Sequence, residues 1–112
     1  MSFEQTGPEV IEFSPDAPHS MRIDYWGGWN FRPQSMEAIE EIERVMPGQF
    51  KYYLYKDVGR TSRLEMTVCK NSKELTEEGE LVFSMASGKK FPRDDLPTMI
   101  EMVKAAIWAA ST

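Results

Sequence analysis

The fold is decided by one stretch of the sequence, Met21-Arg22-Ile23-Asp24-Tyr25-Trp26-Gly27-Gly28-Trp29-Asn30-Phe31-Arg32-Pro33. Apolar residues alternate from Met21 to Tyr25, which predicts a strand with one buried face. Gly27 and Gly28 then mark a turn. Pro33 suits the first turn of a helix, where its missing N–H costs nothing. The stretch therefore predicts a strand that turns directly into a helix.

The predicted helix continues to Met46. Pro47-Gly48 then ends it, because proline and glycine stop a helix. Its apolar residues recur at helical spacing: Met36, Ile39, Ile42, Val45 and Met46. The aromatic stretch 50–55 follows as a second strand. A strand–helix–strand unit joins parallel strands by a right-handed connection, so these two strands are predicted to pair in parallel.

Two more strands and a second helix complete the predicted domain. The strands at 64–69 and 80–86 alternate in hydropathy and are expected to pair antiparallel across the polar loop 70–79. The last helix begins at Asp94 or Asp95 and carries one apolar stripe: Leu96, Met99, Ile100, Val103 and Ile107. The sequence therefore predicts an α+β, two-layer fold of order β-α-β-β-β-α. Its four-stranded mixed sheet would carry both helices on one face.

The first twenty residues are predicted to form an irregular N-terminal arm ahead of one domain at 21–112. Pro8, Pro15 and Pro18 interrupt this segment, and proline disfavours regular structure. The apolar run at 10–13 is compatible with a short strand or with a peptide that docks on a partner. A chain of 112 residues is most simply one folded domain.

The overall composition is that of an acidic globular protein. Hydrophobic residues make up 41% and charged residues 28% of the chain, which argues against disorder. The net charge of −5 argues against a nucleic-acid partner. No apolar run approaches the roughly 20 residues that span a bilayer. The first twenty residues hold acids but neither Lys nor Arg, unlike a transit peptide. We therefore expect a cytoplasmic protein, or an organellar one if a presequence has been removed.

The chain contains few residues that could support thiol or imidazole chemistry. Cys69 is the one cysteine, so the chain forms neither an internal disulfide nor a thiol zinc cluster. His19 is the one histidine, and in a proline-rich stretch it is expected to be a solvated loop residue. The sequence lacks a Ser-His-Asp set, a phosphate-binding glycine loop and a His–carboxylate cluster. It therefore predicts no catalytic residue, no metal and no cofactor.

A series of short motifs runs through the predicted domain. The first strand ends in Tyr25, followed by Trp26-Gly27-Gly28-Trp29 and, two residues later, Phe31. Further blocks follow in order: Met46-Pro47-Gly48, Leu64-Glu65-Met66, Leu81-Val82-Phe83-Ser84 and Phe91-Pro92. In order and spacing, residues 21 to 110 resemble the selenoprotein W (Rdx) family of thioredoxin-like proteins. That resemblance implies the small thioredoxin-like fold.

The departure from this family lies at its redox site. By the resemblance, Trp26 stands where the family has its attacking cysteine, and Trp29 where it has selenocysteine or a second cysteine. Thiol–disulfide exchange needs a thiolate and a resolving thiol, and an indole supplies neither. We therefore expect a binding site at Trp26, Gly27, Gly28, Trp29 and Phe31. Either the indoles pack on the protein's own helices, beside Phe31 or Trp108, or they are exposed anchors for another protein.

The leading functional hypothesis is a non-catalytic thioredoxin-fold module, acting in protein binding or as an accessory subunit of a complex. Its partner would be another protein, or a second copy bound through the open sheet face. That face would carry either Lys51, Tyr53 and Tyr55 or Tyr52 and Leu54. One alternative is a redox protein working through Cys69 with an external thiol such as glutathione, although a half-buried, unreactive Cys69 is expected. The other is a small-ligand binder at the Trp26/Trp29 tip.

Overall fold

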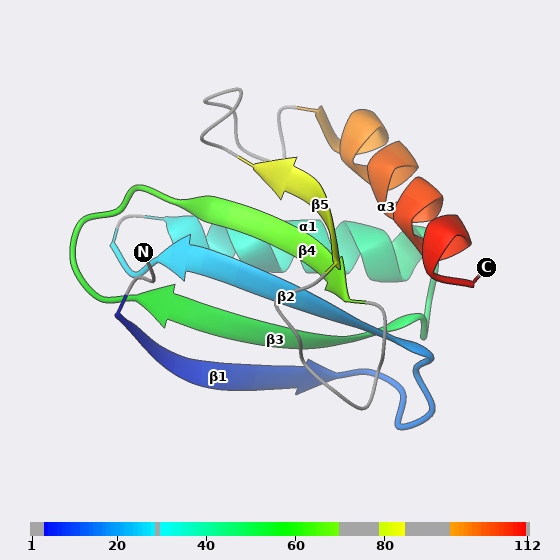
Figure 1. Ribbon diagram of the computed structural model, residues 1–112, viewed down its shortest axis with the longest axis horizontal. Coiled ribbons are helices and arrows are strands. Elements are labelled where there is room, and N and C mark those ends of the chain that lie inside the picture. Colours follow the sequence, from blue (N-terminus) through cyan, green and yellow to red (C-terminus); the bar gives the residue numbers. More distant parts are fainter. Residues whose placement is uncertain (1–3, 29, 70–78, 85–94, 112) are drawn as a thin grey trace.

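The computed structural model describes residues 4–28, 30–69, 79–84 and 95–111, with side chains to Trp108 (Figure 1). Its elements are β1 Gln5–Glu12, β2 His19–Trp26, α1 Phe31–Val45, β3 Phe50–Asp57, β4 Leu64–Cys69, β5 Gly79–Ser84 and α3 Leu96–Ser111. The fold is α+β, with a five-stranded mixed sheet in the order β1-β3-β2-β4-β5. In the described part of the chain, neither helix is apolar over a sufficient length to cross a membrane.

The predicted pairing of the central strands is confirmed. β2 and β3 pair in parallel and are joined through α1, while β4 pairs antiparallel with β2 on its other side. β5 pairs antiparallel with β4, as the sequence predicted for the last two strands. The last strand ends at Ser84, and the predicted continuation to 86 lies outside the described residues.

The prediction of an irregular arm and of four strands was wrong, because residues 5–12 form a fifth strand. β1 pairs antiparallel with β3 and so lies at the edge of the sheet. Pro8 sits where the pairing register shifts between Thr6 and Glu9. Proline has no N–H to donate, and an edge strand with a bulge is where a sheet tolerates it. Pro8 therefore marks the edge of the sheet.

One face of the sheet forms the core together with both helices. Alternate strand residues point into it: Met21, Ile23 and Tyr25 in β2, Tyr52 and Leu54 in β3, and Leu64, Met66 and Val68 in β4. α1 lies behind the sheet in Figure 1 and buries Ala38, Ile39 and Ile42 in the same cluster. α3 packs along β5 and β4 and also contacts α1. The apolar stripes predicted for the two helices are thus the stripes that meet the sheet.

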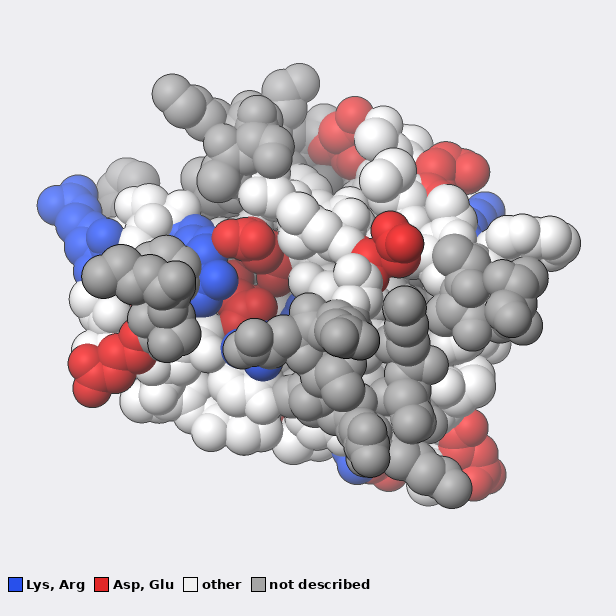
Figure 2. All heavy atoms as spheres, in the orientation of Figure 1, with Lys and Arg blue, Asp and Glu red and all other residues white. Residues whose placement is uncertain are grey.

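The opposite face of the sheet is polar and aromatic. Tyr53 and Tyr55 lie on it, half-buried, whereas Tyr52 and Leu54 are buried in the core. The Arg22 guanidinium lies 4.2 Å from the centre of the Tyr55 ring. Acidic and basic side chains gather side by side on this face, which is turned to the viewer in Figure 2. Of the two sets considered for this face, the one with Tyr53 and Tyr55 is correct.

Candidate functional site

The loop between β2 and α1 is closed over by its own tryptophan. The Trp26 ring meets the Phe31 ring edge-on, with centroids 5.3 Å apart and an interplanar angle of 84°. Phe31 is only 4% exposed, and Trp26 is half-buried against the core. Trp26 therefore packs on its own protein, whereas Trp108 on α3 is 76% exposed. Trp29, the second tryptophan of the predicted site, lies outside the described residues.

The two glycines of the loop leave room for side chains that fold across it. A Cβ at Gly28 would lie 2.4 Å from Trp26 Cζ2. A Cβ at Gly27 would lie 2.6 Å from Lys56 Cδ. The Trp26 indole thus covers Gly28, and the methylene stem of Lys56 covers Gly27. Any larger residue would displace one of these side chains.

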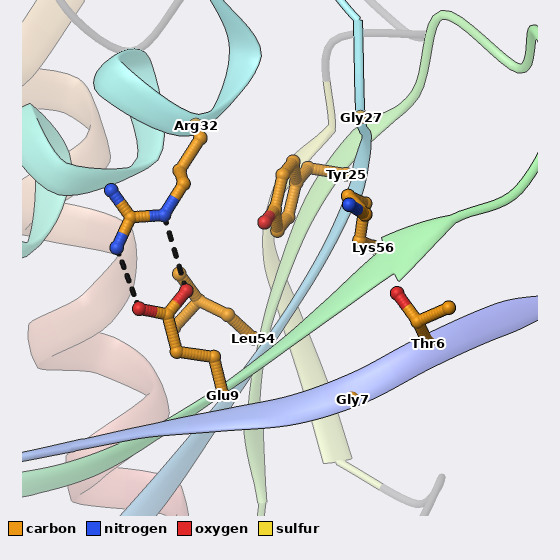
Figure 3. A pocket seen from close by; sticks show the side chains of 8 residues that line it. All are labelled: Thr6, Gly7, Glu9, Tyr25, Gly27, Arg32, Leu54 and Lys56. Carbon is orange, nitrogen blue, oxygen red and sulfur yellow. Dashed lines mark hydrogen bonds and ion pairs between the residues drawn. The ribbon is translucent and has the colours of Figure 1, made fainter.

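A pocket of about 330 Å³ opens beside this loop (Figure 3). It is lined by Thr6, Gly7, Glu9, Tyr25, Gly27, Arg32, Leu54 and Lys56. The pocket lies beside the bulge of β1, where the register against β3 shifts between Thr6 and Glu9. Gly7 holds φ at +119°, and a Cβ there would lie 2.8 Å from the Leu54 carbonyl oxygen. Glycine thus permits the bent course of β1 along one wall of the pocket.

The charged groups of the pocket are unevenly paired. Arg32 donates from Nε and Nη2 to the two carboxylate oxygens of Glu9, at 3.1 and 2.6 Å. The hydrogen bond from Arg32 lowers the pKa of Glu9, so this carboxyl stays ionised. Lys56 forms no ion pair with any residue that the structure describes. Among the described residues, the positive charge of Lys56 is therefore left without a counter-charge at the pocket.

Tyr25 is the buried polar residue of the pocket. It is 4% exposed, and burial, followed by the charge of Glu9, raises the pKa of its phenol. Figure 3 shows its hydroxyl turned toward the Arg32–Glu9 pair. No residue in the described ranges forms a hydrogen bond with this hydroxyl. A neutral phenol at the pocket is a hydrogen-bond donor available to a ligand.

Of the pocket residues, only Gly27 belongs to the site predicted from the sequence. The others come from β1, the end of β2, β3 and the first turn of α1. The prediction of an irregular arm hid the contribution of β1. One sequence signal pointed to the pocket. Tyr25 lies in the apolar alternation of its strand and directly precedes the loop, so its ring is buried while its hydroxyl needs a polar neighbour.

Cys69 is remote from the loop. It is fully buried, not half-buried as expected, and it pairs with Ser20 near the start of β2. The loop follows Trp26 at the opposite end of that strand. Six strand residues at about 3.3 Å each put the two ends about 20 Å apart. A thiol at this place cannot reach the loop between β2 and α1.

His19 was predicted to be a solvated loop residue, and this was wrong. It begins β2, is buried, and lies against Phe50 with ring centroids 5.8 Å apart. Burial lowers the pKa of its imidazole. Within the described ranges, no three His, Cys, Asp or Glu side chains converge in a way that could hold a metal ion.

No family model, curated protein or solved structure matches the chain. Function is therefore inferred from its own residues and their geometry.

Proposed function

We propose that the protein is a non-catalytic thioredoxin-like module that binds another protein. The strand order β3-β2-β4-β5, with α1 after β2 and α3 after β5, supports a thioredoxin-like core. β1 then extends this core at one edge. The motifs around Trp26 and Phe31 support a relationship to the selenoprotein W family, with the dithiol replaced.

The chemistry of the loop argues for binding over redox catalysis. A reactive thiol in such a fold gains its thiolate character at a helix N-terminus. Here Trp26 lies at that end of α1 and packs on Phe31. Cys69 is buried at the end of β4, beside the start of β2 and far from the loop, which argues against the alternative of one-thiol chemistry.

The observation that carries the binding proposal is a hollow of about 520 Å³ on the sheet face opposite α1. It is lined by Ser14, Pro15, Asp16, Ala17, Pro18, Lys51 and Tyr53. Val10 lies directly across from Tyr53 on β1 and is 47% exposed. Residues opposite each other in an antiparallel pair share a face. We therefore propose that Val10, Tyr53 and the hollow form a contact surface for a second protein chain, as aromatic residues are enriched at interfaces.

The first test compares two apolar residues with the same exposure. Val10 and Met102 are each 47% exposed, but Met102 lies on α3. Val10→Asp is expected to weaken the complex at least about 10-fold, because the charge is buried at the interface. Met102→Asp is expected to leave the complex intact. If the protein self-associates, sedimentation velocity measures the dimer affinity of each variant. If a partner co-purifies, both proteins are purified and the affinity of each variant for the partner is measured by titration.

Two results would contradict the interface. One is a complex that survives Val10→Asp and is lost with Met102→Asp. The other is a protein that stays monomeric and co-purifies with nothing under conditions that preserve its fold.

The second test introduces a pair of cysteines at the positions where the family has its redox dithiol. In a Cys69→Ser background, Trp26→Cys/Trp29→Cys is expected to form a reversible disulfide, because the thioredoxin-like loop places both thiols by the helix. The protein with its own tryptophans is expected to be inactive in disulfide reduction, with or without Cys69. Disulfide reduction that depends on Cys69 would reject the non-catalytic role. A double variant that folds but forms no disulfide would reject the thioredoxin-like loop.

A further inference from the structure

We propose that the pocket beside the β2–α1 loop binds a small monocarboxylic acid. Its carboxylate would be held by the Lys56 ammonium and the Tyr25 hydroxyl, with its apolar body against the Tyr25 ring and Leu54. This site goes beyond the protein-binding role and does not depend on it. The two surfaces lie on opposite faces of the sheet, since Tyr25 and Leu54 belong to the buried face and Tyr53 to the other.

The charge of the pocket fits one negative group. Glu9 is neutralised by the two hydrogen bonds from Arg32. Lys56 is the pocket's remaining cation, and no described residue pairs with it. A carboxylate carries the single charge that Lys56 matches. A phosphate dianion would need a second cation, and Arg32 is already engaged.

The position of Lys56 is set by its neighbours. Lys56 and Tyr25 are paired across the parallel strands β3 and β2, so their side chains share a face. The Lys56 stem crosses Gly27 so closely that even a methyl group there would meet its methylenes. Gly27 thereby lets the ammonium lie at the pocket beside the Tyr25 ring. In the proposed site, the ligand carboxylate bridges the Lys56 ammonium and the Tyr25 hydroxyl, which line the same pocket.

The Tyr25 hydroxyl supplies a hydrogen bond that the protein itself leaves unused. Buried polar groups almost always have a partner. The Tyr25 ring is buried, but its hydroxyl lies at the pocket and bonds to no described residue (Figure 3). Because the pKa of the phenol is raised, this group is a donor at neutral pH. A carboxylate accepts such a bond, whereas a cationic ligand does not.

The size of the pocket limits the ligand. About 330 Å³ is near the lower end of ligand pockets, which run from about 300 to 1,000 Å³. A small acid with a short apolar body fits this volume, and a nucleotide does not. Thr6, at the β1 wall, supplies a second hydroxyl for a polar group on the ligand.

The experiment titrates the full ¹⁵N-labelled chain with benzoate and follows its amide resonances. The amides of Thr6, Gly7, Gly27 and Lys56 are expected to shift together, with a Kd of about 1 mM or tighter. Benzamide, which has the same shape without the charge, is expected to leave them unmoved. Inorganic phosphate is expected to bind at least about 10-fold more weakly than benzoate.

Three variants connect the shifts to the residues. Lys56→Gln is expected to weaken benzoate binding at least about 10-fold, and Tyr25→Phe about 3- to 10-fold. Lys51→Gln is the matched control, because Lys51 lies on the same strand but on the opposite face, paired with Glu12. It is expected to leave the Kd unchanged. Thermal unfolding of each variant verifies that it is folded.

Several outcomes would overturn the site. The site is rejected if benzoate shifts none of the pocket amides. It is also rejected if benzamide binds as tightly as benzoate. An unchanged Kd in Lys56→Gln removes the ammonium from the site, and tighter binding of phosphate rejects the carboxylate. Val10→Asp is expected to keep benzoate binding while it loses the protein complex. The failure of one proposal is thereby distinguished from the failure of the other.

Discussion

At the residue scale, Asp57 connects several strands through one buried carboxylate. Its side chain is fully buried and accepts hydrogen bonds from Arg63 at 2.6 and 2.9 Å and from Thr61 at 2.8 Å. Gln5 of β1 donates to Asp57 at 2.9 Å and to Asp24 of β2 at 2.7 Å. The network thus joins β1, β2, β3 and the segment before β4 on the sheet face opposite the helices.

Asp57→Asn is expected to lower the free energy of unfolding by about 3 kcal/mol. The amide leaves the half-buried Arg63 guanidinium without its main counter-charge, and that loss exceeds the value of the hydrogen bonds alone. Urea unfolding at pH 7 measures the change. Glu41→Gln, which removes an exposed pair with Arg44, is the control and should change the free energy of unfolding far less than Asp57→Asn does. Equal stability of the two variants would show that the Asp57 network contributes little.

The same carboxylate predicts how stability depends on pH. Burial alone would raise the pKa of Asp57, but hydrogen bonds from Arg63, Gln5 and Thr61 outweigh it and lower the pKa below the ordinary value of 3.8. The unfolded chain therefore takes up the proton first. The stabilisation is complete above about pH 5 and is lost as the pH falls through the folded-state pKa.

Urea midpoints measured from pH 6 to pH 2 are expected to fall below about pH 4. The decline should be shallower in Asp57→Asn, which has no carboxyl to titrate. Glu9 contributes in the same direction through Arg32, so Glu9→Gln is measured beside it. Identical pH profiles for the parent protein and Asp57→Asn would contradict the role of Asp57.

At the scale of the element, β1 is a strand with a bend that its sequence specifies. Gly7 adopts a φ of +119°, a conformation that residues with a side chain rarely take. The register against β3 shifts here, and the pairing resumes from Glu9 to Glu12. This bend forms one wall of the pocket at Tyr25 while the ends of β1 stay in the sheet.

Gly7→Ala is expected to cost about 2 kcal/mol or more of stability, because it combines the strained φ with a contact of 2.8 Å to the Leu54 carbonyl oxygen. Gly59→Ala is the matched control. Gly59 also has a positive φ, of +87°, but a Cβ there has open space around it, so about 1 kcal/mol is expected. Thermal and urea unfolding compare the two. If the two substitutions lower the free energy of unfolding equally, the contact between the new Cβ at position 7 and the Leu54 carbonyl oxygen is relieved by a shift of the backbone.

At the scale of the whole molecule, Cys69 reports on the integrity of the fold. It lies at the end of β4, fully buried, and pairs with Ser20 of the central strand β2. A thiol reagent reaches such a group only after the structure opens. Its labelling rate is therefore a measure of opening in the middle of the sheet.

The native protein is expected to react with a maleimide at least about 100-fold more slowly than an exposed thiol does. Ala105→Cys in a Cys69→Ser background supplies that exposed thiol, since Ala105 lies on the outer side of α3. Denaturant should bring the two rates together. Rapid labelling of Cys69 in the native protein would contradict its burial and would reopen one-thiol chemistry.

Much of the secondary structure could be predicted from the sequence, because residues that face the core recur at the period of a strand or of a helix. The strand faces with Met21 and Ile23, the helical stripes and the parallel β2–β3 pair all follow from short periodic patterns and chain connectivity. The candidate loop was found because a turn between a strand and a helix has its own glycines. The packing of Trp26 could not be predicted, because the same sequence is compatible with an indole that folds onto the protein and with one that is exposed.

Only the tertiary structure decided the roles of β1, the Asp57 network and the pocket. Gln5 and Asp57 are 52 residues apart in the chain, and no local pattern records that their side chains meet. The prolines of the first twenty residues disfavour a strand locally, and the edge of β3 supplies the hydrogen bonds that make one. In the same way, Lys56 and Tyr25, the residues of the proposed carboxylate site, lie side by side because the neighbouring strands β3 and β2 pair. The turn at Gly27 and Gly28 is thus determined by the local sequence, while the pocket beside it is determined by contacts between distant segments.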